Sequence, residues 1–166
     1  MELLLNQQEA DELIAMLKVF LKDNFITLKD GTNAKIDISS KQHNREFILY
    51  IHYQHNNCHL NFMDCSTKIN LIRINLNGSF HKNANGDIIR GNRVNLFCED
   101  EYNQREDGIY MRAYKLPYNE ILKEPKTFID ALDELINYIN LVDNRHKLQV
   151  APSIFDSGEN YDYDHW

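Results

Sequence analysis

The sequence FILYIHYQHNNCHLNFMDCSTKINLIRINLN, residues 47–77, decides the fold class. Residues 47–53 are rich in β-branched and aromatic side chains, which favour strands. Residues 59–63 and 69–77 alternate between apolar and polar side chains, and this period of two is typical of a strand with one buried and one solvated face. Asn56-Asn57 offers a turn between the first two segments. The stretch therefore predicts consecutive antiparallel strands.

Shorter segments of the same kind lie on both sides of this stretch, at 25–29, 35–38, 94–97 and 109–114. Asp30-Gly31, between the first two of them, is a hairpin-turn dipeptide. No helix is predicted between successive segments, and this arrangement favours antiparallel pairing of neighbours. We expect a largely antiparallel sheet of about six or seven strands.

Amphipathic helices are predicted before and after these strands. Residues 7–22 carry apolar side chains three or four positions apart, and Asn6 with Glu9 forms a capping box at their start. Residues 127–141 show the same two signals. Each helix is apolar on one side only, so both should pack on one face of the sheet while the other face carries Asn, Lys, Arg and His. The expected fold class is α+β: an antiparallel sheet with an N-terminal and a C-terminal helix on one face.

The chain has 166 residues, the length of one domain. We expect a single α+β domain over residues 1–149 and a tail over residues 150–166 that mixes acids with aromatics and shows no period. This tail is either a frayed end or a segment that docks on a surface.

Composition and charge exclude several classes of protein. Eighteen Lys and Arg stand against 25 Asp and Glu, a net charge of −7, which argues against direct binding to nucleic acid or to an anionic membrane. No stretch approaches the roughly 18 apolar residues of a membrane span, and residues 1–5 lack the basic start of a signal peptide. The three cysteines do not indicate a disulfide framework, because such a framework uses an even and larger number of cysteines. We expect a cytoplasmic protein.

The loop at 77–93 is the most unusual part of the chain, because it holds three of the six glycines. Asn85-Gly86-Asp87 suits a turn that requires a positive φ. His81 and Asn83 are two residues apart and would lie on one side of an extended segment. If the domain were an enzyme, the candidate catalytic residues would be His81 as the acid–base group and Asn83, with Asp87 as the nearest carboxylate.

The segments 71–78, 81–89 and 91–97, read in order, resemble an uncharacterised prokaryotic family, a domain of unknown function, whose members read LLRLDhxG, HxNPDGxxI and GxHhHhY, where h is apolar. Leu116-Pro117 and the C-terminal helix continue the resemblance, which spans about residues 47–141. It implies a bacterial, phage or mobile-element setting and no established activity.

This chain departs from the family pattern at the positions that would carry chemistry. Arg93 and Asn95 replace the two histidines of HxH, and Asn75 replaces the Asp of LRLD. Of the possible ligands in the family pattern, only His81 and Asn83 remain. One His and one Asn cannot hold zinc, which takes three or four protein ligands. We therefore expect no metal and no cofactor, and an enzyme is less expected than a binding protein.

Histidines also gather around the turn at 56–57, where His52, His55 and His59 with Cys58 flank the predicted hairpin and could meet across it. Their spacing matches no zinc motif, and exposed strand and turn residues are the simpler interpretation.

Charge is distributed unevenly along the chain. A cluster of acids at 99–107 predicts a negative surface that could bind a basic groove on another protein; it consists of Glu99, Asp100, Glu101, Glu106 and Asp107. The preceding loop carries cations that could contact a phosphate: Lys82, Arg90 and Arg93.

The leading hypothesis is a non-catalytic protein-binding domain of mobile-element or phage type, which acts by covering a surface on a host or defence protein. An anti-CRISPR-like inhibitor is its most specific form. The alternatives are a small enzyme or a nucleotide- or phosphate-binding module built on the His81 loop, and an antitoxin-like partner protein.

Overall fold

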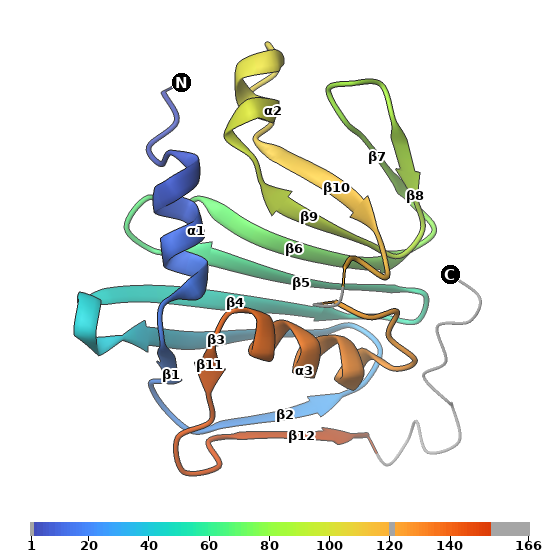
Figure 1. The fold of residues 1–166 in the computed structure, drawn as a ribbon. Helices are drawn as coiled ribbons and strands as arrows, with labels where there is room; N and C mark the ends of the chain where they lie inside the picture. Colours follow the sequence, from blue (N-terminus) through green and yellow to red (C-terminus); the bar gives the residue numbers. More distant parts are fainter. Residues whose placement is uncertain (1, 120–121, 154–166) are drawn as a thin grey trace.

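A computed structural model describes residues 2–119 and 122–153. Its main element is an eight-stranded sheet (Figure 1). In spatial order the strands are β10 (Met111–Lys115), β9 (Arg93–Phe97), β6 (Asn70–Asn77), β5 (Asn57–Asp64), β4 (Arg45–Tyr53), β3 (Thr32–Ser40), β1 (Lys18–Phe20) and β11 (Leu141–Val142). Neighbouring strands are antiparallel except β1 and β11, which are parallel.

Two small sheets complete the β structure. β2 (Asn24–Leu28) pairs in parallel with β12 (Leu148–Pro152), and β7 (Phe80–Lys82) forms an antiparallel hairpin with β8 (Ile88–Arg90). β12 contains the first residues of the predicted tail, whereas residues 154–166 of that tail lie outside the described residues. The helical elements are short: α1 (Gln7–Ala15), η1 (Lys41–His43), α2 (Glu99–Gln104) and α3 (Phe128–Tyr138).

The predicted fold class is therefore wrong. The sequence predicted an α+β fold with an antiparallel sheet of six or seven strands and two flanking helices; the described part of the chain is mostly β, with twelve strands, a mixed eight-stranded sheet and three short α-helices. The first helix ends at Ala15 rather than near residue 22, because Lys18–Phe20 pairs with β3 and β11. Tertiary pairing thus overrides an apolar spacing that suits a helix.

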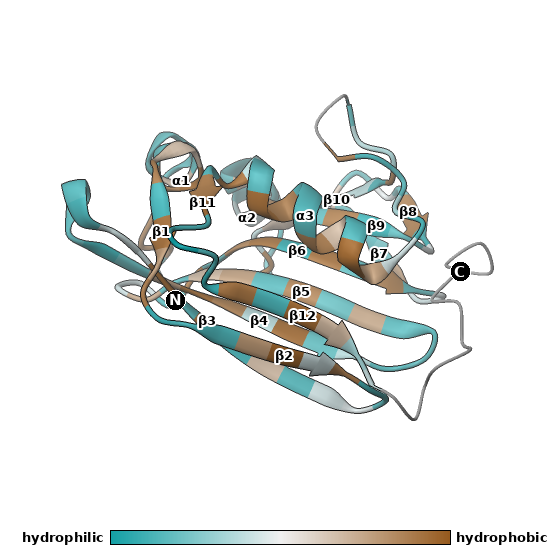
Figure 2. Ribbon diagram, turned by 90° about the horizontal axis from the view of Figure 1, so that it is seen from below, coloured by the Kyte–Doolittle hydropathy of each residue, from teal (hydrophilic) through white to brown (hydrophobic). Residues whose placement is uncertain are grey.

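The core lies between the sheet and the helices. Alternate residues of β4 and β5 are buried, and Phe47 stacks on Phe62 with ring centroids 5.0 Å apart. Figure 2 shows α1 and α3 on the same side of the sheet, and Phe128 of α3 packs edge-on against Tyr53 of β4. Burying each such side chain contributes about 1.5–3 kcal/mol. No helix in the described ranges is long and apolar enough to cross a bilayer.

A buried lysine ties the ends of two helices together. The Lys18 side chain is fully buried, and its Nζ donates hydrogen bonds to the carbonyls of Ile14 (2.7 Å), Met16 (2.7 Å) and Ile139 (2.6 Å). The same Nζ lies over the rings of Phe47 and Phe62, 5.3 and 5.5 Å from their centroids. Burial lowers the pKa of Lys18 to about 7.

Candidate functional site

The two regions that the sequence singled out, the 77–93 loop and the acidic segment at 99–107, contact each other. The hairpin β7–β8 stands beside β10 and near α2 (Figure 1). Glu101 Oε2 accepts a hydrogen bond from the Ala84 amide at the hairpin tip (2.9 Å), and Arg105 Nη1 donates to the Lys82 carbonyl (2.6 Å). The structure therefore joins both regions into one unit.

Glu101 is the centre of this unit and is fully buried. Its Oε1 accepts from Arg112 Nε (2.8 Å), and Arg105 lies 3.7 Å from Oε2. Burial by itself would raise the pKa of Glu101, but the hydrogen bonds from Arg112 and Ala84 lower it below its ordinary value. Glu101 therefore holds the hairpin on α2 and β10, and it is not part of an outer acidic surface.

Of the other four acids of the predicted surface, Glu99 and Asp107 are bonded to neighbouring residues, whereas Asp100 and Glu106 face solvent. Glu99 accepts a hydrogen bond from the Gln7 amide at the start of α1 (2.7 Å), and Asp107 pairs with Arg105 (2.8 Å). Asp100 and Glu106 are exposed. The five acids thus do not form one free negative patch.

Asn83 pairs with the outer edge of the large sheet. Its Oδ1 accepts from the Ala113 amide (2.8 Å) and its Nδ2 donates to the Ala113 carbonyl (2.9 Å), as a neighbouring strand would do. β10 is an edge strand, and unpaired edges are open to association with other chains. Asn83 therefore covers this edge.

His81 is half-buried, and its Nε2 has no hydrogen-bond partner among the described residues. Burial, with smaller contributions from the charges of Arg105 and Arg93, lowers its pKa, so the ring is neutral at pH 7. Asp87 lies at the exposed hairpin tip, where its Oδ2 accepts from Asn85 Nδ2 (3.1 Å). The three residues of the predicted acid–base set thus make separate contacts.

The three predicted phosphate-binding cations are also divided. Arg93 is buried at the base of the hairpin, where its Nη1 donates to Asn77 Oδ1 (2.9 Å) and to the carbonyls of Ser79 and Gly91. Lys82 and Arg90 are exposed on the hairpin itself.

The outward face of the hairpin combines these two cations with apolar side chains that the sequence analysis missed. The register Phe80↔Arg90 and Lys82↔Ile88 puts all four side chains on one side. Phe80 is 53% exposed and Ile88 49% exposed, and the Arg90 guanidinium lies 4.9 Å from the Phe80 ring centroid. The alternation in Phe80–Lys82 and Ile88–Arg90, on either side of the glycine turn, was the available signal. We call these four residues the hairpin face.

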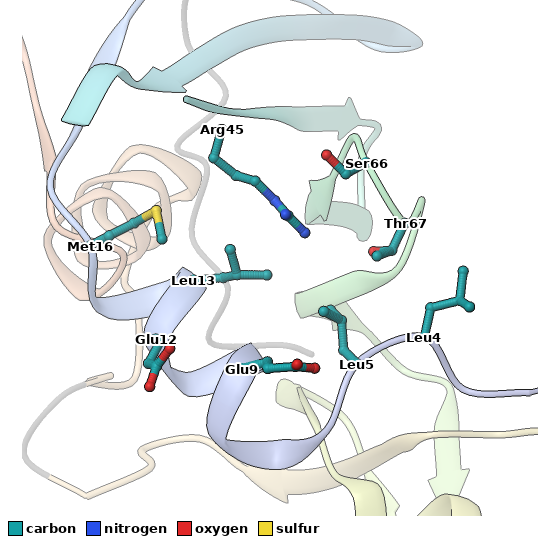
Figure 3. A pocket seen from close by; sticks show the side chains of 9 residues that line it. All are labelled: Leu4, Leu5, Glu9, Glu12, Leu13, Met16, Arg45, Ser66 and Thr67. Carbon is teal, nitrogen blue, oxygen red and sulfur yellow. The ribbon is translucent and has the colours of Figure 1, made fainter. Parts of the chain in front are cut away.

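A pocket of about 360 Å³ opens beside α1 (Figure 3). Figure 3 shows Arg45, Leu5, Leu13 and Thr67 around it. Arg45 is already bound to the buried carboxylate of Asp64 by two hydrogen bonds of 2.7 and 2.8 Å. Glu9 completes the capping box of α1. Arg45 and Glu9 therefore serve the fold.

The histidines beside the β4–β5 turn meet as the sequence suggested. His52 and His59 stack with ring centroids 4.7 Å apart, whereas Cys58 is buried on the opposite face of β5. Within residues 2–119 and 122–153, no three His, Cys, Asp or Glu side chains are grouped so that they could hold a metal ion.

Comparison with known proteins gives one match. No curated protein and no solved structure matches the chain. A family model described as "Family of unknown function (DUF6978)" matches residues 5–141, which is most of the chain and includes the predicted region of resemblance. The expectation of a domain of unknown function is confirmed. The chain belongs to DUF6978, a family of unknown function.

Proposed function

We propose that this domain is a non-catalytic binding protein and that the hairpin face contacts its protein partner. The observation that carries the proposal is the exposure of Phe80 and Ile88 next to Lys82 and Arg90 on a hairpin beside the sheet edge. Aromatic and Arg side chains are enriched among the residues that dominate binding energy at protein interfaces.

The hairpin is held in place before any partner binds. Asn83 fixes it to β10, Glu101 fixes its tip, and Arg93 fixes its base through the carbonyls of Ser79 and Gly91. A surface that is already ordered loses little conformational entropy on association. These bonds therefore support a recognition role for the hairpin face.

Charge defines the kind of partner. Lys82 and Arg90 flank the apolar pair, so the complementary surface is an apolar depression with acidic residues at its rim. On this proposal the host or defence protein expected from the sequence, the target of an anti-CRISPR-like inhibitor or of an antitoxin, would carry such a surface in place of the basic groove that the acidic segment predicted. The exposed acids Asp100 and Glu106 are available for an outer contact.

The contacts of the predicted acid–base residues support binding over catalysis. The side-chain amide of Asn83 makes two hydrogen bonds to the backbone of Ala113, one through its oxygen and one through its nitrogen. The Asp87 carboxylate accepts a hydrogen bond from Asn85. A catalytic base is typically oriented by another hydrogen-bonding group. Asn83 and Asp87, which the sequence offered beside His81, are engaged in holding the hairpin.

Site-specific photo-crosslinking in the native host tests the proposal. A benzoylphenylalanine at position 80 should capture a discrete protein partner, and Arg90→Glu should abolish the capture. The matched control is the same probe at Phe25 of β2, which is 71% exposed and belongs to the separate β2–β12 sheet, and which should capture none. Equal capture from both positions would refute the proposal, as would loss of biological activity in His81→Ala but not in Phe80→Ala.

A further inference from the structure

The face of the large sheet that turns away from the core carries a row of side chains with a cation at each end. The register places these four residues side by side across β3, β4, β5 and β6: Lys35, Tyr50, Asn61 and Arg73. Lys35 is exposed and its Nζ lies 5.9 Å from the centroid of the Tyr50 ring, whereas Arg73 is half-buried. We call these four residues the cationic row.

Both cations of the row lack an acidic partner. Arg73 Nε donates to Asn75 Oδ1 (2.9 Å), and no ion pair within residues 2–119 and 122–153 includes Arg73 or Lys35. Burial lowers the pKa of Arg73, because its guanidinium is partly desolvated and no carboxylate offsets the cost. Partly buried cations are normally paired, so this arrangement favours an anionic group on the row.

A pocket of about 290 Å³ opens along the row, which we call the sheet-face pocket. Tyr50, Asn61 and Arg73 are part of its lining. Two acids of the same face, Asp37 and Glu46, lie further along β3 and β4 and outside this lining, and Asp37 is already paired with Lys22 (3.0 Å). The pocket therefore offers the Arg73 guanidinium to a carboxylate from elsewhere, a pairing whose planar geometry is complementary.

The sequence that follows β12 has the opposite charge. Residues 154–166 lie outside the described residues, and their sequence contains four acids and no Lys or Arg; the acids are Asp156, Glu159, Asp162 and Asp164. Tyr161-Asp162-Tyr163-Asp164 alternates aromatic and acidic residues. In an extended segment such alternation puts the carboxylates on one side and the rings on the other.

This segment begins close to the cationic row. Ser153 N donates to the Leu28 carbonyl (2.9 Å), and Thr32 Oγ1 donates to the Thr27 carbonyl (3.2 Å), so the end of β12 lies beside the turn that leads into β3. β3 and β6 are three strand spacings apart, about 14 Å. The nine residues from Ser153 to Asp162 can span about 30 Å when extended, so Asp162 can reach Arg73.

We propose that residues 161–164 of this chain dock on the cationic row, with the carboxylates of Asp162 and Asp164 paired with Arg73 and Lys35. Of the two alternatives that the sequence left open for the tail, a frayed end or a docking segment, the proposal selects docking. The docked segment closes the cationic row to other anionic partners. The inference does not depend on the hairpin face, which belongs to a different part of the molecule.

Intramolecular crosslinking in the full chain tests this inference. A benzoylphenylalanine at position 163, in dilute purified protein, should crosslink within one copy of the chain to residues of β3–β6 on the outer face, as mapped by mass spectrometry. Crosslinks that join two copies would make a second copy the occupant and would overturn the proposal, as would crosslinks to the core side of the sheet or none at all. Crosslinking at position 80 reads the hairpin face separately, so either result can fail alone.

Matched variants locate the contact. Arg73→Gln should weaken docking about tenfold, or about 1.4 kcal/mol, because a hydrogen bond between charged groups is lost. The pair Asp162→Asn and Asp164→Asn should do the same from the tail, without altering the sheet. Arg90→Gln on the hairpin and Asp100→Asn on α2, both at exposed positions, should leave docking unchanged.

Trp166 gives a second reading without a probe, because it is the only tryptophan in the sequence. Quenching of its fluorescence by acrylamide should increase in Arg73→Gln and in the Asp162/Asp164 variant, and also in 1 M salt, where the Debye length is only about 3 Å. Arg73→Glu combined with Asp162→Lys should restore protection that Arg73→Glu alone removes. Crosslinking and quenching that do not respond to these variants would refute the proposal.

Discussion

The buried Lys18 makes the stability of the protein depend on pH in a defined direction. Its side chain is inaccessible to water, and burial lowers its pKa from 10.5 to about 7. Between these two values the unfolded chain holds a proton on Lys18 that the folded chain has released. The free energy of unfolding therefore rises with pH in this window, and the contribution disappears as the pH falls through about 7.

The size of the effect follows from the width of the window. One proton of difference corresponds to about 1.4 kcal/mol for each pH unit. From about pH 7.5 to 9.5 the Lys18 term should thus stabilise the native state by about 2.7 kcal/mol. Cys65 opposes it at the alkaline end, because burial raises the pKa of this thiol. The Lys18 term must therefore be measured as a difference between two proteins.

Lys18→Met provides this difference, because Met keeps the length of the side chain in an apolar site and removes the titrating group. Urea unfolding of both proteins across the window should show the wild type gaining about 2.7 kcal/mol over the variant. Lys41→Met, at an exposed position, controls for the loss of one lysine. A pH-independent difference would refute the reasoning and would mean that the three carbonyl acceptors keep Lys18 charged. An NMR titration of the Lys18 ammonium group in the unmodified protein reads the same midpoint directly.

Three further predictions follow from the contacts described above. Glu101→Gln should lower the free energy of unfolding by about 1.5–3 kcal/mol, because the hydrogen bonds from Arg112 and from the Ala84 amide lose their charged acceptor, whereas Glu106→Gln should change it by less than about 0.5 kcal/mol; equal values in urea unfolding would contradict the buried network. Asn83→Ala should speed hydrogen exchange of the Ala113 amide by tenfold or more, about 1.4 kcal/mol, and unchanged protection would show that the sheet edge does not need this side chain. His59 should remain neutral down to about pH 4, so stability should fall as the pH drops from 6.5 toward 4, where only the unfolded chain binds the proton. An NMR midpoint near the ordinary value would contradict the desolvation of this ring.

Local patterns in the sequence predicted the central strands and missed those that depend on distant partners. β4 coincides with the segment rich in β-branched and aromatic side chains, and β5 and β6 overlap the alternating segments 59–63 and 69–77. Lys18–Phe20 carries a spacing that also suits a helix, and only its pairing with β3 and β11 makes it a strand. β12 pairs with β2 from more than 120 residues away, a contact that no window of sequence reports.

The candidate sites also depend on contacts between residues that are far apart in the sequence. The sequence identified the 77–93 loop from its glycines, but the roles of Asn83 and Glu101 follow from contacts 30 and 17 residues away. The hairpin face depends on the pairing of β7 with β8, which brings Phe80, Lys82, Ile88 and Arg90 to one side. This pairing is a property of the folded hairpin that composition does not report.

The parallel pairs β1–β11 and β2–β12 can form only late in synthesis, because each joins a strand near residue 20 to one beyond residue 140. β1 and β2 therefore leave the ribosome long before β11 and β12. During that interval the antiparallel meander from β3 to β6 can form, because each of its strands pairs with the next one along the chain. A nascent chain interrupted after α3 would expose the outer edges of β1 and β2 to other chains, so termination at that point should yield aggregates rather than a shortened functional domain.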